Sequence, residues 1–255
     1  MGVKLIAVLV GLYVIYGVLM VALHPRLIYP FYPDDQVLPG FTRVALTGAD
    51  GTEISVQESS GEGPVVLYFM GNVGSLAYFE AALAHYIAKG RHVIAMEYRG
   101  GAGRPGVPSE TSLKSDALIA ADYAFATEKP VVVHGFSLGT GLATYVSARR
   151  PVAHTILIAP YDRLCALMAA RSRLPACWIP GVQKWRSLDE AAQIKTPILI
   201  LHGREDPLIP PIRSQAFSDL PQVKRVIIEG ASHNNMADFP EREAEIDAVF
   251  ERLGG

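Results

Sequence analysis

The sequence is poor in several features that mark particular protein classes. Its 255 residues include 23 lysines and arginines against 25 aspartates and glutamates, so no basic surplus points to a nucleic-acid partner. Only two cysteines occur, Cys165 and Cys177, which excludes a disulfide-rich scaffold. They are twelve positions apart (177 − 165), too far for a C-x-x-C redox or zinc pair, and are expected to be ordinary thiols or one bridge. The length fits one large α/β domain, alone or with an appendage.

Charge is absent from the first long segment, Leu5–Leu23. At 1.5 Å per residue, a helix of these roughly 19 residues is close in length to the ~30 Å hydrocarbon core of a membrane. The apolar run is long for a cleaved signal peptide, and its end, LMVALHP, is a poor cleavage site. We therefore predict an uncleaved signal anchor that spans the membrane once, with a cleaved signal peptide as the alternative.

The charges that flank this anchor are nearly balanced. Lys4 and the amino terminus lie on one side, and Arg26 and Arg43 lie on the other, so the positive-inside rule selects neither orientation. The short N-terminal tail favours an inside N-terminus, which predicts that the following domain lies on the non-cytoplasmic side.

A proline-rich segment, residues 24–40, follows the anchor. Its four prolines and its lack of periodicity predict a connection. We therefore divide the chain into an anchor at residues 1–25 and a folded domain at residues 26–255. The aromatic residues of the connection are expected either at the membrane interface or packed on the domain: Tyr29, Phe31 and Tyr32.

Short apolar stretches alternate with helical stretches through the rest of the chain. Strands are expected at residues 42–46, 53–57, 65–69, 92–97, 131–134, 155–159, 197–202 and 223–229. Helices are expected at residues 75–88, 111–127, 138–149, 211–220 and 241–253, the second capped by Ser109 or Thr111. This alternation predicts an α/β fold with a mostly parallel sheet covered on both faces. An excursion at residues 161–195 is expected to form a short cap over one edge of the sheet.

The stretch HGFSLG, residues 134–139, combines a buried strand, a sharp turn and a helix. In G-x-S-x-G, two glycines allow a tight bend that lifts the serine hydroxyl above the sheet. Ser137 is therefore the candidate nucleophile, and an ordinary serine-containing turn is the alternative. The N–H of Leu138, at the start of the following helix, is a candidate oxyanion donor. A second donor is expected from Asn72, in the glycine-rich loop FMGNVGS after strand 65–69.

A serine nucleophile needs a base and an acid that orients the base. Among seven histidines, His233 follows the last expected strand in a loop of small and polar residues, where sites form in open α/β sheets. Asp206 follows the preceding apolar strand, in the order serine, acid, histidine. Asp162 is the rival acid, since it also follows a strand. His134 lies inside a strand and is expected to be a buried residue rather than the base.

These motifs together resemble the Bem46/ABHD13-type branch of the α/β-hydrolases. The matching stretches run from about residue 26 to residue 235: RLIYPFYP, YFMGNVGS, EYRGGAGRPGVPSE, HGFSLG, APYDRL, PILILHGREDPLIP and GASHNN. Two positions depart from the family pattern, because Met70 stands where histidine is usual and Glu97 stands where aspartate is usual. The resemblance implies the α/β-hydrolase fold and cleavage of carboxylic esters, lipid esters or thioesters through an acyl-enzyme, with aminopeptidase or acyl-peptidase activity as an alternative.

The expected partners follow from this interpretation. The substrate is a small or lipid-like ester, the membrane is reached through the N-terminal helix, and no metal or organic cofactor is needed. The glycine-rich loop 99–106 lacks the G-x-x-x-x-G-K-[ST] pattern of a phosphate cradle. Basic residues in the cap excursion are expected either to meet anionic head groups or to form an ordinary solvated face: Arg163, Arg171, Arg173, Lys184 and Arg186. A membrane-anchored binding protein that keeps the fold without turnover is the competing hypothesis.

Overall fold

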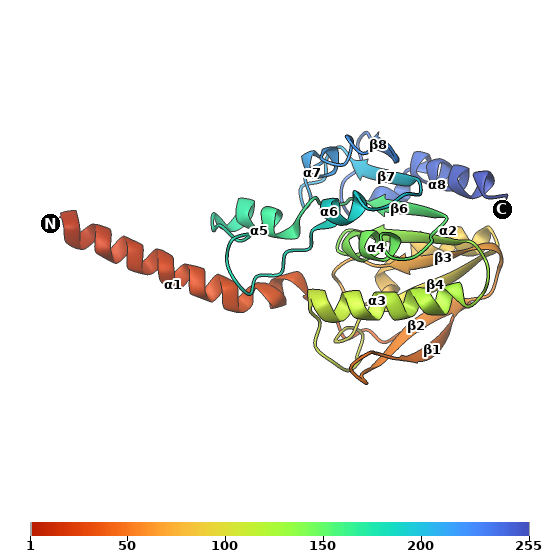
Figure 1. Ribbon diagram of the computed structural model, residues 1–255, viewed down its shortest axis with the longest axis horizontal. Coiled ribbons are helices and arrows are strands. Elements are labelled where there is room, and N and C mark those ends of the chain that lie inside the picture. The colour runs from red at the N-terminus through yellow and green to blue at the C-terminus, as the bar shows by residue number, and fades with distance from the viewer. Residues whose placement is uncertain (1, 255) are drawn as a thin grey trace.

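An eight-stranded sheet forms the centre of the protein (Figure 1). The structure, a computed structural model, describes residues 2–254. The strands lie in the order β1-β2-β4-β3-β5-β6-β7-β8. Their bounds are β1 Thr42–Thr47, β2 Glu53–Ser59, β3 Glu62–Phe69, β4 Arg91–Glu97, β5 Val131–Phe136, β6 His154–Ile158, β7 Ile198–Gly203 and β8 Val223–Ile228. The pairs β1–β2 and β2–β4 are antiparallel and all later neighbours are parallel, which confirms the mostly parallel sheet.

Helices cover both faces of this sheet. The α-helices are α1 Gly2–Ile28, α2 Glu80–Ala88, α3 Glu110–Phe125, α4 Gly139–Ser147, α5 Leu164–Ser172, α6 Ser187–Ala191, α7 Ile212–Gln215 and α8 Pro240–Arg252. Two 3-10 helices are η1 Leu76–Phe79 and η2 Met236–Asp238. On one face α3, α4 and α6 pack together, and on the other face lie α2 and α8 (Figure 1). The rings of Tyr86 in α2 and Phe250 in α8 meet edge to face. Because both faces are covered, β7 is buried along its whole length and β3 is buried from Pro64 onward.

Local sequence explains where several helices begin and end. Ser109 caps α3, since its hydroxyl accepts the N–H of Ser112 and the Ser112 hydroxyl accepts the N–H of Ser109. Pro240 opens α8 at a position where its missing N–H costs no hydrogen bond. The helix expected at 211–220 is much shorter than predicted, because the residues after α7 continue with i→i−3 hydrogen bonds that form turns.

Helix α1 projects away from the sheet and extends beyond the expected end of the anchor at residue 25 (Figure 1). Pro25 lies inside the helix and cannot donate an N–H to the carbonyl of Val21. His24 compensates, because its Nδ1 lies 2.6 Å from that carbonyl oxygen and can donate to it. The helix therefore passes the proline and ends at Ile28, which is buried against the domain.

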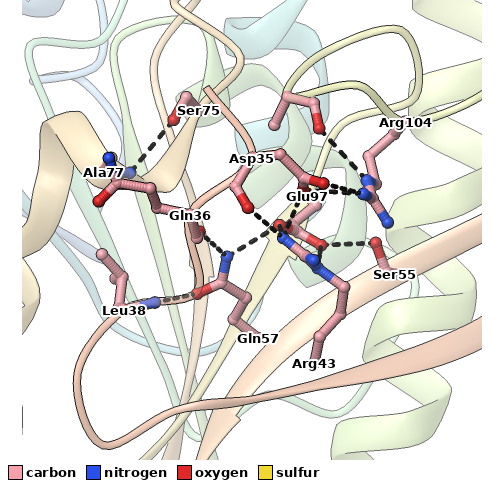
Figure 2. Close-up of polar contacts among 11 residues, drawn as sticks. Asp35, Gln36, Leu38, Arg43, Ser55, Gln57, Ser75, Ala77, Glu97 and Arg104 are labelled. Carbon is pink, nitrogen blue, oxygen red and sulfur yellow. Dashed lines mark hydrogen bonds and ion pairs between the residues drawn. The ribbon is translucent and has the colours of Figure 1, made fainter. Parts of the chain in front are cut away.

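The connection after α1 is tied to the domain by a buried polar network (Figure 2). The Glu97 carboxylate accepts hydrogen bonds from Arg43, Ser55 and Gln57. Burial raises the pKa of Glu97, but these three donors outweigh it and hold that pKa below its ordinary value. Gln57 also accepts the N–H of Leu38, so the network holds the connecting segment in place. Glu97, which departs from the family pattern, thus has a structural role in this chain.

The aromatic residues of the connection pack mainly on the domain. Tyr29 is buried and donates its hydroxyl to Gln183, and Phe31 is half-buried with its ring 5.9 Å from that of Tyr98. Tyr32 is half exposed. Of the two expected environments, the domain surface therefore holds the first two rings.

Candidate active site

The serine turn lies between β5 and α4, at the carboxyl end of the sheet. Ser137 has a φ of +51°, a left-handed conformation that costs a non-glycine residue of order 1–3 kcal/mol. The turn is tight because a Cβ at Gly135 would lie 2.5 Å from the Gly139 carbonyl oxygen, and one at Gly139 would overlap the Phe69 carbonyl oxygen. The N–H of Ser137 is held by the carbonyl of Ile158 at 2.9 Å. The strained backbone therefore points the serine hydroxyl above the sheet.

Three side chains from three loops form one hydrogen-bonded chain at this turn. Ser137 Oγ lies 3.0 Å from His233 Nε2, and His233 Nδ1 lies 2.7 Å from Asp206 Oδ2. All three residues are buried, and the Phe136 ring lies 5.1 Å from the imidazole. With Nδ1 protonated toward the carboxylate, Nε2 is free to accept the serine proton.

The environment of Asp206 keeps its carboxylate ionised. Burial raises the pKa of Asp206, but hydrogen bonds from His202, His233 and the Ile209 N–H outweigh burial and hold it well below its usual range. Oδ1 also accepts the N–H of Leu208 at 2.8 Å, so the loop after β7 is wrapped around the carboxylate. A negative charge is thereby fixed next to the imidazole.

The rival candidates lie elsewhere. Asp162 faces Arg213, with Oδ1 at 3.4 Å from a guanidinium nitrogen, and makes no contact with His233 among the described hydrogen bonds. His134 is buried, bonded to Tyr86 at 2.7 Å, and its pKa lies well below the ordinary value because burial disfavours the cation. His134 is therefore a neutral core residue, as its position in the strand predicts.

The expected oxyanion residues border the same cavity as Ser137. Leu138 and Asn72 both line it, Leu138 directly after the serine and Asn72 in the loop after β3. That loop is positioned by Tyr98, whose hydroxyl donates to the Met70 carbonyl at 2.7 Å. The Met70 side chain is buried. Although methionine replaces the histidine that is usual in the family, the backbone of this loop is therefore still held by the hydrogen bond from Tyr98.

The excursion at residues 161–195 forms a cap over the site. Helices α5 and α6 lie within it, and Cys165 and Cys177 are joined by a disulfide, the bridge that the sequence left as one of two possibilities. Beneath the cap is a cavity of about 420 Å³ with Ser137 at its wall. This volume is in the range of small-molecule sites. Within residues 2–254 no group of three histidine, cysteine, aspartate or glutamate residues is placed to hold a metal ion.

Comparison with known proteins finds relatives of the same architecture. No protein-family model matches the chain. An uncharacterised protein of Mycobacterium tuberculosis is 28% identical over 229 residues, which cover 82% of this chain and 80% of that protein. Lysophosphatidylserine lipase ABHD12 of Xenopus tropicalis is 32% identical over 171 residues, and protein bem46 of Schizosaccharomyces pombe is 29% identical over 174 residues. The matched parts are 58% and 60% of this chain, but only 44% of the lipase and 55% of bem46.

Solved structures share the fold. An esterase of Pyrococcus furiosus has a TM-score of 0.70 at 18% identity, covering 89% of this chain and 99% of the esterase chain. The chain has the α/β-hydrolase fold and is similar in sequence to α/β-hydrolase domain proteins. The resemblance to Bem46-like proteins is thereby confirmed. A proline iminopeptidase of Mycobacterium smegmatis has a TM-score of 0.67 at 16% identity, over 83% of this chain and 98% of its own. The fold of this α/β-hydrolase therefore does not by itself separate ester from amide substrates.

The sequence reading missed the contribution of α1 to the site of this α/β-hydrolase. Six residues of α1 line the cavity beside Ser137: Tyr16, Met20, Val21, His24, Leu27 and Ile28. A signal was present, because a lone histidine in an apolar helix, followed by proline, is unusual for an anchor that only crosses lipid. The partner of that histidine, Gln183, is 159 residues away in the cap, a separation at which sequence spacing carries no information.

Proposed function

We propose that this α/β-hydrolase is a serine hydrolase that cleaves carboxylic esters of lipid-like molecules through an acyl-enzyme. The observation that carries the proposal is the continuous hydrogen-bonded chain from Ser137 through His233 to Asp206. The strained conformation of the serine supports it, because a nucleophile elbow places the serine in such a bend.

In the proposed reaction, His233 Nε2 accepts the Ser137 proton while Oγ attacks the ester carbonyl carbon. Asp206 accepts the Nδ1–H bond and stabilises the imidazolium, and the N–H groups of Leu138 and Asn72 bind the oxyanion. His233 then protonates the leaving alcohol as the C–O bond breaks. Water, deprotonated by His233, attacks the acyl-enzyme, releases the acid and restores Ser137. These residues make every proton transfer, so the proposed reaction uses no metal or organic cofactor.

The lining of the cavity favours an ester with an acyl chain over a peptide. Most of its lining side chains are apolar, and among the described residues no carboxylate lines it, whereas Arg171 does. An aminopeptidase would need an anion to bind the α-ammonium of its substrate. The relative that is named a lysophosphatidylserine lipase is consistent with a lipid ester. Paired ester and aminoacyl-amide substrates would separate the two activities.

We also propose that the N-terminal segment anchors the enzyme, with the domain on the non-cytoplasmic side. α1 is long and apolar enough to cross a membrane, and none of its most apolar stretch is buried in the protein, unlike the core helix of a soluble domain. The Cys165–Cys177 disulfide supports this side of the membrane, because disulfides persist in oxidising compartments.

A fluorophosphonate probe tests the proposed function directly. Membranes that contain the wild type, Ser137→Ala or His233→Ala would be labelled and analysed by gel fluorescence. We expect the wild type alone to be labelled, because the probe reacts with an activated serine. A folded wild type that stays unlabelled would support the competing hypothesis, a binding protein that retains the fold without turnover.

A further inference from the structure

One face of α1 contacts the domain and becomes more buried toward the C-terminal end of the helix, from Tyr13 at 50% to His24 at 5% of full accessibility. The residues on this face recur at helical spacing and contact the cap or the cavity: Tyr13, Tyr16, Gly17, Met20, Val21, His24 and Ile28. The opposite face is exposed, with Val18 at 64% and Leu19 at 53% of their full accessibility. A helix that served only as a tether would need no such face.

The C-terminal part of this face is joined to the domain by hydrogen bonds. His24 Nε2 accepts the N–H of Gln183 at 3.3 Å, while its Nδ1 lies against the Val21 carbonyl oxygen. The Gln183 side chain accepts from the Tyr29 hydroxyl and from the N–H of Glu110, at the start of α3. One glutamine thus connects the end of α1, the cap and the body of the domain.

The cap also contacts α1 nearer the N-terminus of this helix. The Tyr16 hydroxyl donates to the Ser172 carbonyl and the Tyr13 hydroxyl to the Arg173 carbonyl, both at 3.0 Å. Eleven residues separate His24 from Tyr13 (24 − 13), so the cap tip accompanies α1 over roughly 16 Å of its length. This distance is about one leaflet of a ~30 Å hydrocarbon core.

The cap tip, residues 172–179, has the composition of a segment that enters a membrane surface. Trp178 is 88% exposed, and tryptophan is enriched where protein meets the lipid head groups. Two arginines are nearby: Arg171 turns toward the domain and donates to the carbonyls of Pro207 and Leu208, and Arg173 is exposed.

Resting on the proposed function, we propose that α1 is a wall of the acyl-binding site and that the cavity opens between α1 and the cap tip into the near leaflet. The substrate is an ester lipid of that leaflet. Its acyl chain lies against Met20 and Val21, and its ester carbonyl reaches Ser137 without crossing water. The anchor thereby selects the substrate as well as holding the enzyme.

Acyl-chain selectivity tests this assignment with two matched variants of one helix. Val21 faces the cavity and Val18 faces outward, so Val21→Trp fills the site whereas Val18→Trp adds the same bulk outside it. The wild type and both variants would be reconstituted in phosphatidylcholine vesicles and assayed with butyryl and palmitoyl esters. We expect Val21→Trp to lower the ratio of palmitoyl to butyryl kcat/KM at least tenfold, and Val18→Trp to leave the ratio within twofold of wild type.

Equal ratios in all three proteins would overturn the proposal while leaving the serine hydrolase intact. A wild type that hydrolyses neither ester and resists fluorophosphonate would instead refute the proposed function. A bifunctional probe, palmitic acid with a diazirine in its chain, gives a readout that needs no turnover. Photocrosslinks should map to the α1 peptide around Met20 and Val21. Crosslinks confined to other helices would contradict the assignment of α1 as a wall of the acyl-binding site.

Depth measurement tests the opening into the leaflet, and the chain is suited to it. It has two tryptophans, of which Trp185 is fully buried and Trp178 is exposed. In vesicles, nitroxide lipids labelled at carbon 5 should quench wild-type fluorescence at least twofold more than they quench Trp178→Phe. If aqueous iodide quenches Trp178 and the lipid nitroxides do not, the cap tip lies in water and the proposed opening is wrong.

Discussion

Asp206 has two tasks in the candidate site, one on each carboxylate oxygen. Oδ2 faces the imidazole of His233 at 2.7 Å, and Oδ1 accepts the N–H groups of Leu208 and Ile209. In the proposed reaction the first contact orients the base, and the second organises the loop after β7. An amide in place of the carboxylate keeps an acceptor for the loop but removes the negative charge beside the ring.

Asp206→Asn should therefore separate the two tasks. We expect kcat for ester hydrolysis to fall roughly 10³–10⁴-fold, because the amide stabilises the wrong imidazole tautomer and no longer compensates the imidazolium. The melting temperature should change by only a few degrees. Asp162→Asn is the control, since Asp162 faces Arg213. Steady-state kinetics and thermal melts of both variants would measure these effects. An equal loss of kcat in both variants would mean that Asp206 is not the acid of the site.

At the scale of elements, the cap is held by local constraints rather than by a large core of its own. The Cys165–Cys177 bridge joins the first turn of α5 to the segment that follows this helix, and so closes a short loop that contains most of α5. Beyond the bridge, Lys184 Nζ donates to the carbonyls of Ala176 and Ile179. The bridge lowers the conformational entropy of the unfolded segment, by less for a short loop than for a long one, and should thereby stabilise the cap locally.

Cys177→Ser should loosen this loop without unfolding the sheet. A bridge across a loop of about 15 residues contributes about 3 kcal/mol. This bridge joins residues with a sequence separation of 12, so without it the loop should open roughly a hundredfold more often. Trypsin cleavage after Arg171 and Arg173, followed by mass spectrometry, would measure this opening. Reductant should accelerate cleavage of the wild type and leave the variant unchanged. Equal cleavage rates in oxidised wild type and variant would mean that the bridge contributes little.

At the scale of the whole molecule, two buried histidines make stability depend on pH. Burial lowers the pKa of His154 from 6.5 to about 4, and it lowers the pKa of His134 well below 6.5. Below pH 6.5 the unfolded chain binds protons at these positions and the folded chain does not. Stability is therefore complete above pH 6.5 and falls as the pH drops toward 4.

His154→Gln should remove one of the two protons by which the unfolded chain exceeds the folded chain below pH 6.5. The slope of unfolding free energy against pH, between 6.5 and 4, should decrease by about 1.4 kcal/mol per pH unit. Denaturant titrations of the full chain in detergent micelles, at half-unit pH intervals, would measure the slope. An unchanged slope would mean that His154 is already protonated in the folded protein over this range.

The whole molecule also couples the anchor to the site. The Glu97 network holds the connecting segment (Figure 2). Gln183 holds the end of α1. These contacts hold the domain directly against the end of α1. The orientation of the cavity relative to α1 is thus a property of the fold.

Much of this protein follows from its sequence alone. Strand and helix alternation determined the parallel sheet, because backbone hydrogen bonding and two-sided burial leave few arrangements for short apolar strands. The G-x-S-x-G turn and the chain order of Ser137, Asp206 and His233 determined which side chains were candidates, since strand ends converge at one edge of such a sheet.

Only the tertiary structure decided what surrounds those residues. The face of α1, the Gln183 junction and the pairing of the two cysteines depend on contacts between segments far apart in the chain. Hydropathy records that Leu5–Leu23 is apolar, but apolar side chains suit lipid, a protein core and an acyl chain equally. Which of these environments each side chain meets is decided by packing geometry, and packing geometry exists only once the chain has folded.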